Sequence, residues 1–161
     1  MKLEKAIFAC GCFWGAQYQF EHAKGVVRST VGYIGGHKEH PAYEEVKAHT
    51  TGHAEATLVE FDAEQTSFTE LCKLFFEIHD PAQTNGQGPD IGPQYRSEIF
   101  YLNDKQKEEA EAVIALLREK GYEVNTKLPP ATTFWEGEEY HQHYYDKTGG
   151  EPYCHIRIKK F

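Results

Sequence analysis

The chain has 161 residues with 17 Lys or Arg and 25 Asp or Glu, which gives a formal net charge of −8. An acidic chain without a long basic run is a poor nucleic-acid binder, because phosphate contacts need Lys and Arg. The composition is that of a globular chain, 40% hydrophobic and 14% aromatic, with no apolar run or signal-like segment that indicates a membrane, so we expect a cytoplasmic protein.

The first third of the chain predicts a strand, a helix and a second strand in succession. Residues 5–9 are apolar, residues 13–23 mix aromatic with helix-forming side chains, and residues 26–33 are rich in β-branched ones. Gly25 suits the left-handed end of the helix. A long loop bearing His and Gly follows, and the alternating polarity of residues 54–61 then predicts another strand.

The second half begins with a capping box at residues 67–70, which opens an apolar helix that runs to about His79. Residues 80–94 hold three Pro and three Gly and predict a loop. The remaining expected elements are, in order, a strand at 97–102, a helix with an apolar stripe at 104–120, a strand at 124–127, a short helix at 138–146 and a Gly-rich tail at 148–161.

Strands and helices therefore alternate without an internal repeat or linker. This pattern predicts one domain over residues 1–161, with an α/β or α+β sandwich architecture. A chain of this length can bury a hydrophobic core without the help of disulfides or bound metals. The pattern leaves the order of the strands open.

The most specific short motif is Gly11-Cys12-Phe13-Trp14-Gly15, at the expected start of the first helix. The thiolate is the reactive form of cysteine, and the free N–H groups at a helix N-terminus favour it. Gly11 permits a sharp turn, Gly15 leaves one helical face bare, and the two aromatic residues offer an apolar wall. The alternative is that Cys12 and its aromatic neighbours simply pack into the core.

The four cysteines do not resemble a secreted disulfide framework, so core, metal-binding and redox roles are all open. Cys72 lies in an apolar run and is expected in the core. Cys10 lies at a strand end, where packing is the expected role, although Cys10-Gly11-Cys12 is also a candidate redox pair.

Beyond this motif, several further stretches resemble one known family, the type A peptide methionine sulfoxide reductases. The resemblance runs in order from about Ala6 to Cys154. Its motifs are GCFWG at residues 11–15, GYIGG at 32–36, PAYEEV at 41–46, TGHAE at 51–55, HDPAQ at 79–83, GPDIGPQYRS at 88–97, EYHQHY at 139–144 and YC at 153–154. It implies a two-layer, ferredoxin-like sandwich with a mixed central sheet flanked by helices.

The resemblance also implies a role for individual residues. Cys12 would be the nucleophile and Glu55 a carboxylic acid that protonates the departing sulfoxide oxygen, which requires a raised pKa. Tyr43 and Tyr95 would point hydroxyls at that oxygen, and Asp90 would be a further polar group of the site. Phe13 and Trp14 would enclose the methyl group of the substrate. Without the resemblance, Glu55 would be expected as an exposed carboxylate, and the tyrosines as ordinary packing residues.

Sulfoxide reduction leaves a sulfenic acid, which condenses with a second thiol. By resemblance, Cys154 in the C-terminal tail is the recycling cysteine, with Cys10 as a second candidate. A dithiol protein such as thioredoxin would then reduce the disulfide. The resemblance implies a monomeric repair enzyme that acts on the S epimer of methionine sulfoxide, free or in proteins, without a metal or organic cofactor.

Three other interpretations remain open. The nine His include closely spaced pairs, listed as His37 and His40, His49 and His53, and His141 and His143, which with cysteines could bind zinc. A thiol–disulfide exchange enzyme could use Cys10 and Cys12 and would not need Glu55. A binding module could hold a peptide on its aromatic surface and would tolerate the loss of Cys12.

Overall fold

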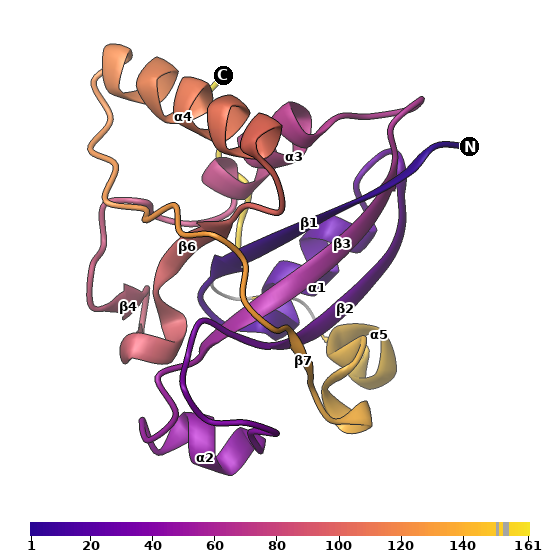
Figure 1. The fold of residues 1–161 in the computed structure, drawn as a ribbon, viewed down its shortest axis with the longest axis vertical. Helices are drawn as coiled ribbons and strands as arrows, with labels where there is room; N and C mark the ends of the chain where they lie inside the picture. Colours follow the sequence, from indigo (N-terminus) through magenta and orange to yellow (C-terminus); the bar gives the residue numbers. More distant parts are fainter. Residues whose placement is uncertain (151, 153–154) are drawn as a thin grey trace.

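The fold comes from a computed structural model, which describes residues 1–150, 152 and 155–161. Five strands form one sheet in the order β6–β1–β3–β2–β7, with antiparallel neighbours throughout (Figure 1). The strands are β1 (Leu3–Cys10), β2 (Val26–Ile34), β3 (Ala54–Asp62), β6 (Ser97–Phe100) and β7 (Trp135–Glu136). Two isolated parallel bridges, Glu98 with Lys127 and Tyr101 with Pro130, extend the sheet beyond β6.

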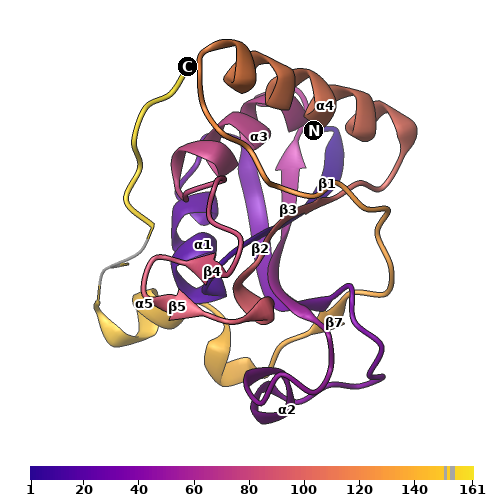
Figure 2. The same cartoon turned by 90° about the vertical axis from the view of Figure 1, so that its left-hand side faces the viewer.

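The helices lie mainly on one face of this sheet, which confirms the expected α/β architecture. They are α1 (Phe13–Glu21), α2 (Tyr43–Lys47), α3 (Phe68–Glu77), α4 (Asp104–Glu119) and α5 (Tyr144–Thr148). Figure 2 shows α1 and α3 on one face, while the chain that follows α4 crosses the other. None of the described helices is both long and apolar enough to span a membrane.

The two faces of β1 and β3 belong to two apolar clusters. Phe8 and Phe61 face α1, α3 and α4, together with most of the large core residues. Ile7 and Ala56 face the chain after α4, where Phe134 covers them. Because both faces are covered, nearly every side chain of β3 is buried, including its polar ones. Glu55 is buried because β3 is covered on both faces.

Local signals set the starts of the two outer helices. The hydroxyl of Ser67 accepts a hydrogen bond from the backbone N–H of Glu70 at 3.1 Å, and α3 begins at the next residue. Asn103 caps α4 in the same way, through the N–H of Gln106 at 2.9 Å. These caps satisfy helix N–H groups that have no partner within the helix.

The structure differs from the sequence predictions in the short elements. Helix α2 lies inside the expected loop before β3, and the expected loop at 80–94 contains a small hairpin, β4 (Gly86–Gln87) with β5 (Asp90–Ile91), and a 3₁₀ turn, η1 (Pro93–Tyr95). The strand expected at 124–127 was wrong: only Lys127 forms a bridge there.

The short helix expected at 138–146 is divided into a 3₁₀ turn, η2 (Glu139–His141), and α5. His143 separates them because its backbone is left-handed, with a φ of 55°. A left-handed residue cannot continue a right-handed helix.

The buried carboxylate of Glu77 attaches the C-terminal segment to the end of α3. Its Oε1 accepts two hydrogen bonds from the Arg157 guanidinium, at 3.0 and 2.8 Å. Its Oε2 accepts the backbone N–H of Lys160 at 2.9 Å, and its carbonyl accepts that of Ile158 at 2.7 Å. The described end of the chain is therefore held firmly against the body of the protein.

Candidate active site

Cys12 is the residue that joins β1 to α1, as the sequence predicted. Gly11 makes the turn with a φ of 97°, a conformation that favours glycine. A Cβ on Gly11 would also lie 2.8 Å from the Cβ of Gln87, so the turn has no room for a side chain. Cys12 is the N-cap of α1 and is half-buried.

The bare helical face at Gly15 is occupied by His155. A Cβ on Gly15 would lie too close to the His155 Nδ1, so only glycine leaves space for this imidazole. The ring is 1% exposed, and its Nε2–H donates to the carbonyl of Cys10 at 2.7 Å. His155 thus anchors the C-terminal segment beside the turn that carries Cys12.

Glu55 lies in the interior, 2% exposed, near the start of β3. Its Oε1 accepts the backbone N–H of Phe13 at 3.2 Å, which places the carboxyl group against the first turn of α1. Its Oε2 is buried without a hydrogen-bond partner among the described residues. Burial raises the pKa of Glu55 to about 8, so the group carries a proton at neutral pH. A protonated carboxyl group can donate from the free oxygen.

The environment of Cys12 combines opposing effects on its thiol. Burial raises its pKa, and the negative charges of Glu55 and Asp90 raise it further. Hydrogen bonds from the backbone N–H groups of Trp14 and Gly15 lower it, as a helix start should, but they do not outweigh burial. The repulsion from Glu55 disappears when Glu55 is protonated, so the thiolate is less unfavourable while the neighbouring acid keeps its proton.

Two tyrosines and one aspartate complete the electrostatic neighbourhood. Tyr43 begins α2 and Tyr95 ends η1, and burial raises the pKa of both hydroxyls, that of Tyr95 to about 12. The charges of Glu55 and Cys12 contribute to both shifts. Asp90, in β5, acts on Cys12, Glu55 and Tyr95. The structure therefore brings these five residues into range of one another.

The two aromatic residues after Cys12 have different surroundings. Phe13 is 1% exposed and packs in a buried cluster with Val31 and Tyr33. Trp14 is half-buried, and its indole stacks on Tyr144 with ring centroids 3.8 Å apart and planes 8° apart. Trp14 is thus the better placed of the two to form the wall of an apolar slot.

The structure describes three of the four cysteines. Cys10, Cys12 and Cys72 are free thiols, and both Cys10 and Cys72 are buried in the main core cluster. Burial raises the pKa of the Cys10 thiol and that of Cys72 as well. Cys154 lies outside the described residues.

Three residues, Glu138, His141 and His155, make contacts near the site that the sequence did not predict. The carboxylate of Glu138 accepts the Tyr33 hydroxyl at 2.8 Å and the backbone N–H of Tyr43 at 3.0 Å, so it fixes the start of α2. The glycines beside Cys12 signal a close neighbour, but the sequence does not say that it is His155.

The described residues that could hold a metal ion lie away from Cys12. Among the described residues, one cluster has metal-ligand spacing, formed by Glu21, His143 and Asp146. It includes none of the described cysteines, and Glu21 ends α1 whereas Cys12 precedes its first residue. Nine residues of helix place the two about 14 Å apart.

Comparisons of sequence and of structure with known proteins identify the same family. A family model described as "Peptide methionine sulfoxide reductase" matches residues 4–161. Proteins named "Peptide methionine sulfoxide reductase MsrA" are 44% identical in Acinetobacter baumannii (strain AYE), covering 97% of this chain and 90% of that protein, and 48% identical in Geobacter sulfurreducens, covering 92% and 93%. The crystal structure of Mxr1 from Saccharomyces cerevisiae in reduced form is 34% identical, with a TM-score of 0.91 over 97% of this chain and 92% of that one.

Proposed function

The chain belongs to the peptide methionine sulfoxide reductase family, and on that premise we propose that it reduces the S epimer of methionine sulfoxide by attack of Cys12 on sulfur. The enzyme reduces methionine sulfoxide as its family does. The observation that carries the proposed residue roles is the contact between a buried, protonated Glu55 and the backbone of Phe13, directly after the Cys12 thiol.

The reductive step needs a nucleophile and a proton in one apolar site. The Cys12 thiolate attacks the sulfoxide sulfur, and Glu55 protonates the oxygen, which is a poor leaving group without a proton. Attack forms a bond between Cys12 Sγ and the substrate sulfur. The protonated oxygen then passes to Cys12 Sγ, the original S–O bond and the new Sγ–S bond both break, and methionine leaves as the sulfide while Cys12 becomes the sulfenic acid. The proton that the thiol gave up balances the one that Glu55 supplied.

Tyr43 and Tyr95 are the proposed donors to the oxygen as its charge grows. Their raised pKa values keep both hydroxyls protonated, so each remains able to donate a hydrogen bond. Asp90 is proposed to complete the polar side of the site. The Trp14 indole, with Phe13 behind it, is proposed to enclose the methyl group on the opposite, apolar side.

Recycling requires a second thiol. We propose that Cys154 condenses with the Cys12 sulfenic acid, forming a disulfide and releasing water. The burial of Cys10 in the core favours Cys154 over Cys10 in this role. A dithiol protein such as thioredoxin is the proposed reductant of that disulfide, and Mxr1 has been crystallised in complex with Trx2.

The proposal also covers the cellular location and the oligomeric state of the enzyme. The described thiols are free, which suits a reducing compartment, so we propose that the enzyme works in the cytoplasm to repair oxidative damage. We expect a monomer of one catalytic domain over residues 1–161 that needs no cofactor for the steps above.

The test is an assay with short peptides that carry either the S or the R epimer of methionine sulfoxide, with dithiothreitol as reductant. Methionine peptide is measured by mass. We expect turnover of the S epimer alone, abolished by Cys12→Ser. A parallel Cys154→Ser variant should form about one methionine per enzyme when dithiothreitol is left out, because the first step needs only Cys12.

Turnover that survives Cys12→Ser would contradict the proposed nucleophile. Turnover of the R epimer would contradict the proposed stereochemistry. If Cys154→Ser turned over with thioredoxin as fast as the unaltered chain does, Cys154 would not be the recycling thiol, and Cys10→Ser would be tested in its place.

A further inference from the structure

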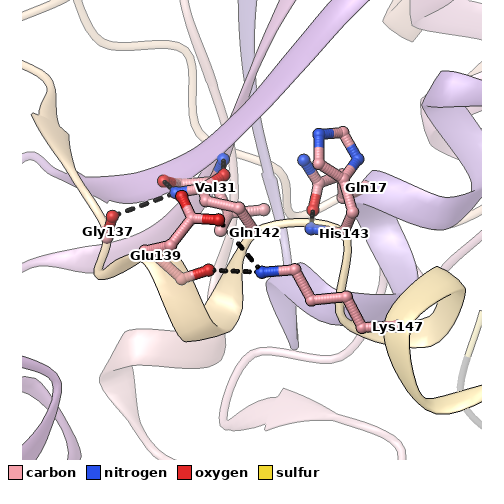
Figure 3. Close-up of polar contacts among 7 residues, drawn as sticks. All are labelled: Gln17, Val31, Gly137, Glu139, Gln142, His143 and Lys147. Atoms are coloured by element: carbon pink, nitrogen blue, oxygen red, sulfur yellow. Dashed lines mark hydrogen bonds and ion pairs between the residues drawn. The ribbon is translucent and has the colours of Figure 1, made fainter.

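The segment from Glu138 to Gln142 contains polar residues that the proposed reaction does not use. Its last residue is clamped onto β2. The amide of Gln142 accepts the backbone N–H of Val31 at 2.9 Å and donates to the carbonyls of Val31 and Gly137 at 2.9 and 3.0 Å. Figure 3 shows this amide between the two backbone segments. The residue before it, His141, is therefore held in a defined place.

The bonds around this clamp fix both sides of the segment. The backbone N–H of His143 donates to the Gln17 side chain at 2.6 Å, which ties the segment to α1. Lys147 donates to the backbone carbonyl of Glu139 at 2.7 Å, and Figure 3 shows its side chain reaching back across the turn. The segment is thus connected to the sheet, to α1 and to α5.

His141 is 1% exposed and lies among aromatic rings of the site. The neighbouring rings belong to Phe13, Trp14, Tyr43 and Tyr140, with centroid distances of 5.2, 5.6, 4.3 and 4.0 Å. Its Nδ1 accepts the indole N–H of Trp14 at 2.9 Å. This hydrogen bond and the stack on Tyr144 fix the Trp14 indole from two sides.

The hydrogen bond determines the state of the imidazole. The indole nitrogen is a donor only, so the Nδ1 of His141 must be an unprotonated acceptor. The proton of the neutral ring then lies on Nε2, which is buried without a partner among the described residues. Burial lowers the pKa of His141, which keeps the ring neutral. A purely apolar ring would avoid the unpaired Nε2–H group but would offer no acceptor to the indole N–H of Trp14, so the acceptor at Nδ1 distinguishes histidine here.

We propose that His141 is a positioning residue for sulfoxide reduction, which orients the Trp14 indole as the wall of the methyl slot through its Nδ1. The inference rests on the proposed role of Trp14. A correctly oriented wall holds the methyl group so that the substrate sulfur faces Cys12. Loss of the acceptor leaves the indole N–H unpaired and frees the ring to turn about its side-chain bonds.

The experiment compares three replacements of His141. In His141→Asn the amide oxygen lies near the position of Nδ1 and still accepts, in His141→Gln the amide reaches the position of Nε2 instead, and in His141→Phe no acceptor remains. His143→Asn is the matched control, since His143 directly follows the segment and is a half-buried histidine bonded to Glu21. We expect kcat/KM to fall roughly tenfold in His141→Gln and His141→Phe and to stay near its original value in His141→Asn.

A second readout follows the hydrogen bond itself. The chain has two Trp, so a ¹H–¹⁵N spectrum contains two indole N–H signals, from Trp14 and Trp135. We expect the Trp14 signal to shift and to exchange faster with solvent in His141→Gln and to remain in place in His141→Asn. This spectrum does not depend on turnover, so failure of the proposed reaction and failure of the positioning role are distinguishable.

A double-mutant cycle with Trp14→Phe completes the test, because that replacement keeps an aromatic wall and removes the N–H donor. His141→Gln should then cause no further loss of kcat/KM in the Trp14→Phe background. Equal losses in His141→Asn and His141→Gln, or the same loss with and without the indole N–H, would overturn the proposal. So would an unchanged Trp14 signal in His141→Gln. If His141→Phe does not fold, the two amide variants still decide the outcome.

Discussion

Two groups of aromatic rings differ in how they are held. In the core ring cluster, Phe8 stacks on three other phenylalanines, Phe20, Phe68 and Phe75, with centroids 5.0 to 5.9 Å apart. The site ring cluster is formed by Phe13, Trp14, Tyr33, Tyr43 and His141, with centroids 4.3 to 6.4 Å apart. In this cluster Trp14, Tyr33 and His141 also take part in hydrogen bonds through their side chains.

Packing alone is sufficient where a ring only has to fill space, as in the core ring cluster. A ring that must face a substrate needs a direction as well, and hydrogen bonds supply it. His141 accepts the indole N–H of Trp14, and Glu138 accepts the hydroxyl of Tyr33 and the backbone N–H of Tyr43. Replacements in the core ring cluster should therefore change stability, and replacements of the groups that meet the substrate should chiefly change catalysis.

The largest effect is expected from the acid of the site. Glu55→Gln removes the proton donor while keeping the size of the side chain, so kcat/KM should fall by about 10²- to 10⁴-fold. Glu60→Gln is the matched control, because Glu60 lies on the same strand, is also buried, and is paired with Arg28 at 2.8 Å. The assay is reduction of a peptide sulfoxide, and similar losses in the two variants would contradict the special role of Glu55.

The next largest effect is a loss of stability in the core ring cluster. Phe75→Ala should lower the free energy of unfolding by about 3–5 kcal/mol, because Phe75 is fully buried and its loss leaves a cavity. The remaining folded protein should keep its kcat/KM. Urea denaturation measures the stability, and Leu116→Ala on the exposed side of α4 is the control. A large loss of kcat/KM in folded Phe75→Ala would weaken the distinction between the two clusters.

A smaller effect is expected where the C-terminal segment packs against the start of α1. Gly15→Ala would place a Cβ against the His155 imidazole, so it should destabilise the fold by about 1–3 kcal/mol. In a His155→Ala background the same change should become stabilising, since Ala favours a helix over Gly. Thermal unfolding of the four proteins checks this reversal of sign, and a penalty that persists without His155 would contradict the assigned contact.

The smallest effect concerns a single hydrogen bond of the site ring cluster. Tyr33→Phe keeps the ring and removes the hydroxyl that Glu138 accepts at 2.8 Å, so the free energy of unfolding should fall by about 0.5–1.5 kcal/mol. Tyr122→Phe, at a 39% exposed tyrosine, is the control and should cost less. Chemical denaturation resolves the pair, and equal values would show that the bond to Glu138 contributes nothing.

Much of the fold could be predicted because its long elements carry local signals. The alternating polarity of β3, the Ser67 cap of α3 and the apolar stripe of α4 each act within a few residues. Helix α2 has only five residues, too few for a periodic pattern, and it depends on the distant Glu138. The strand expected at 124–127 failed because residues 124–127 lie beside β6 with only one bridge to it.

The site residues likewise differ in whether a local sequence signal or a long-range contact sets their position. The glycines, the cysteine and the helix start predicted a reactive Cys12 from local chemistry. Family resemblance supplied Glu55, because its burial depends on covering both faces of β3. The contacts of His141 and His155 with α1 were not predicted, because each joins residues more than 120 positions apart in the sequence. Such contacts leave no periodic pattern in the chain.

The proposed reaction depends above all on Glu55 holding a proton at neutral pH beside Cys12. Its most direct test is a titration of the chain with ¹³C-labelled glutamate carboxyl groups, followed by NMR. One glutamate should titrate near pH 8 and be absent from the spectrum of Glu55→Gln, and kcat/KM should fall above the same pH as the acid loses its proton. If the Glu55 carboxyl group titrates near the ordinary glutamate value of about 4.3, it is ionised at neutral pH and the account is contradicted.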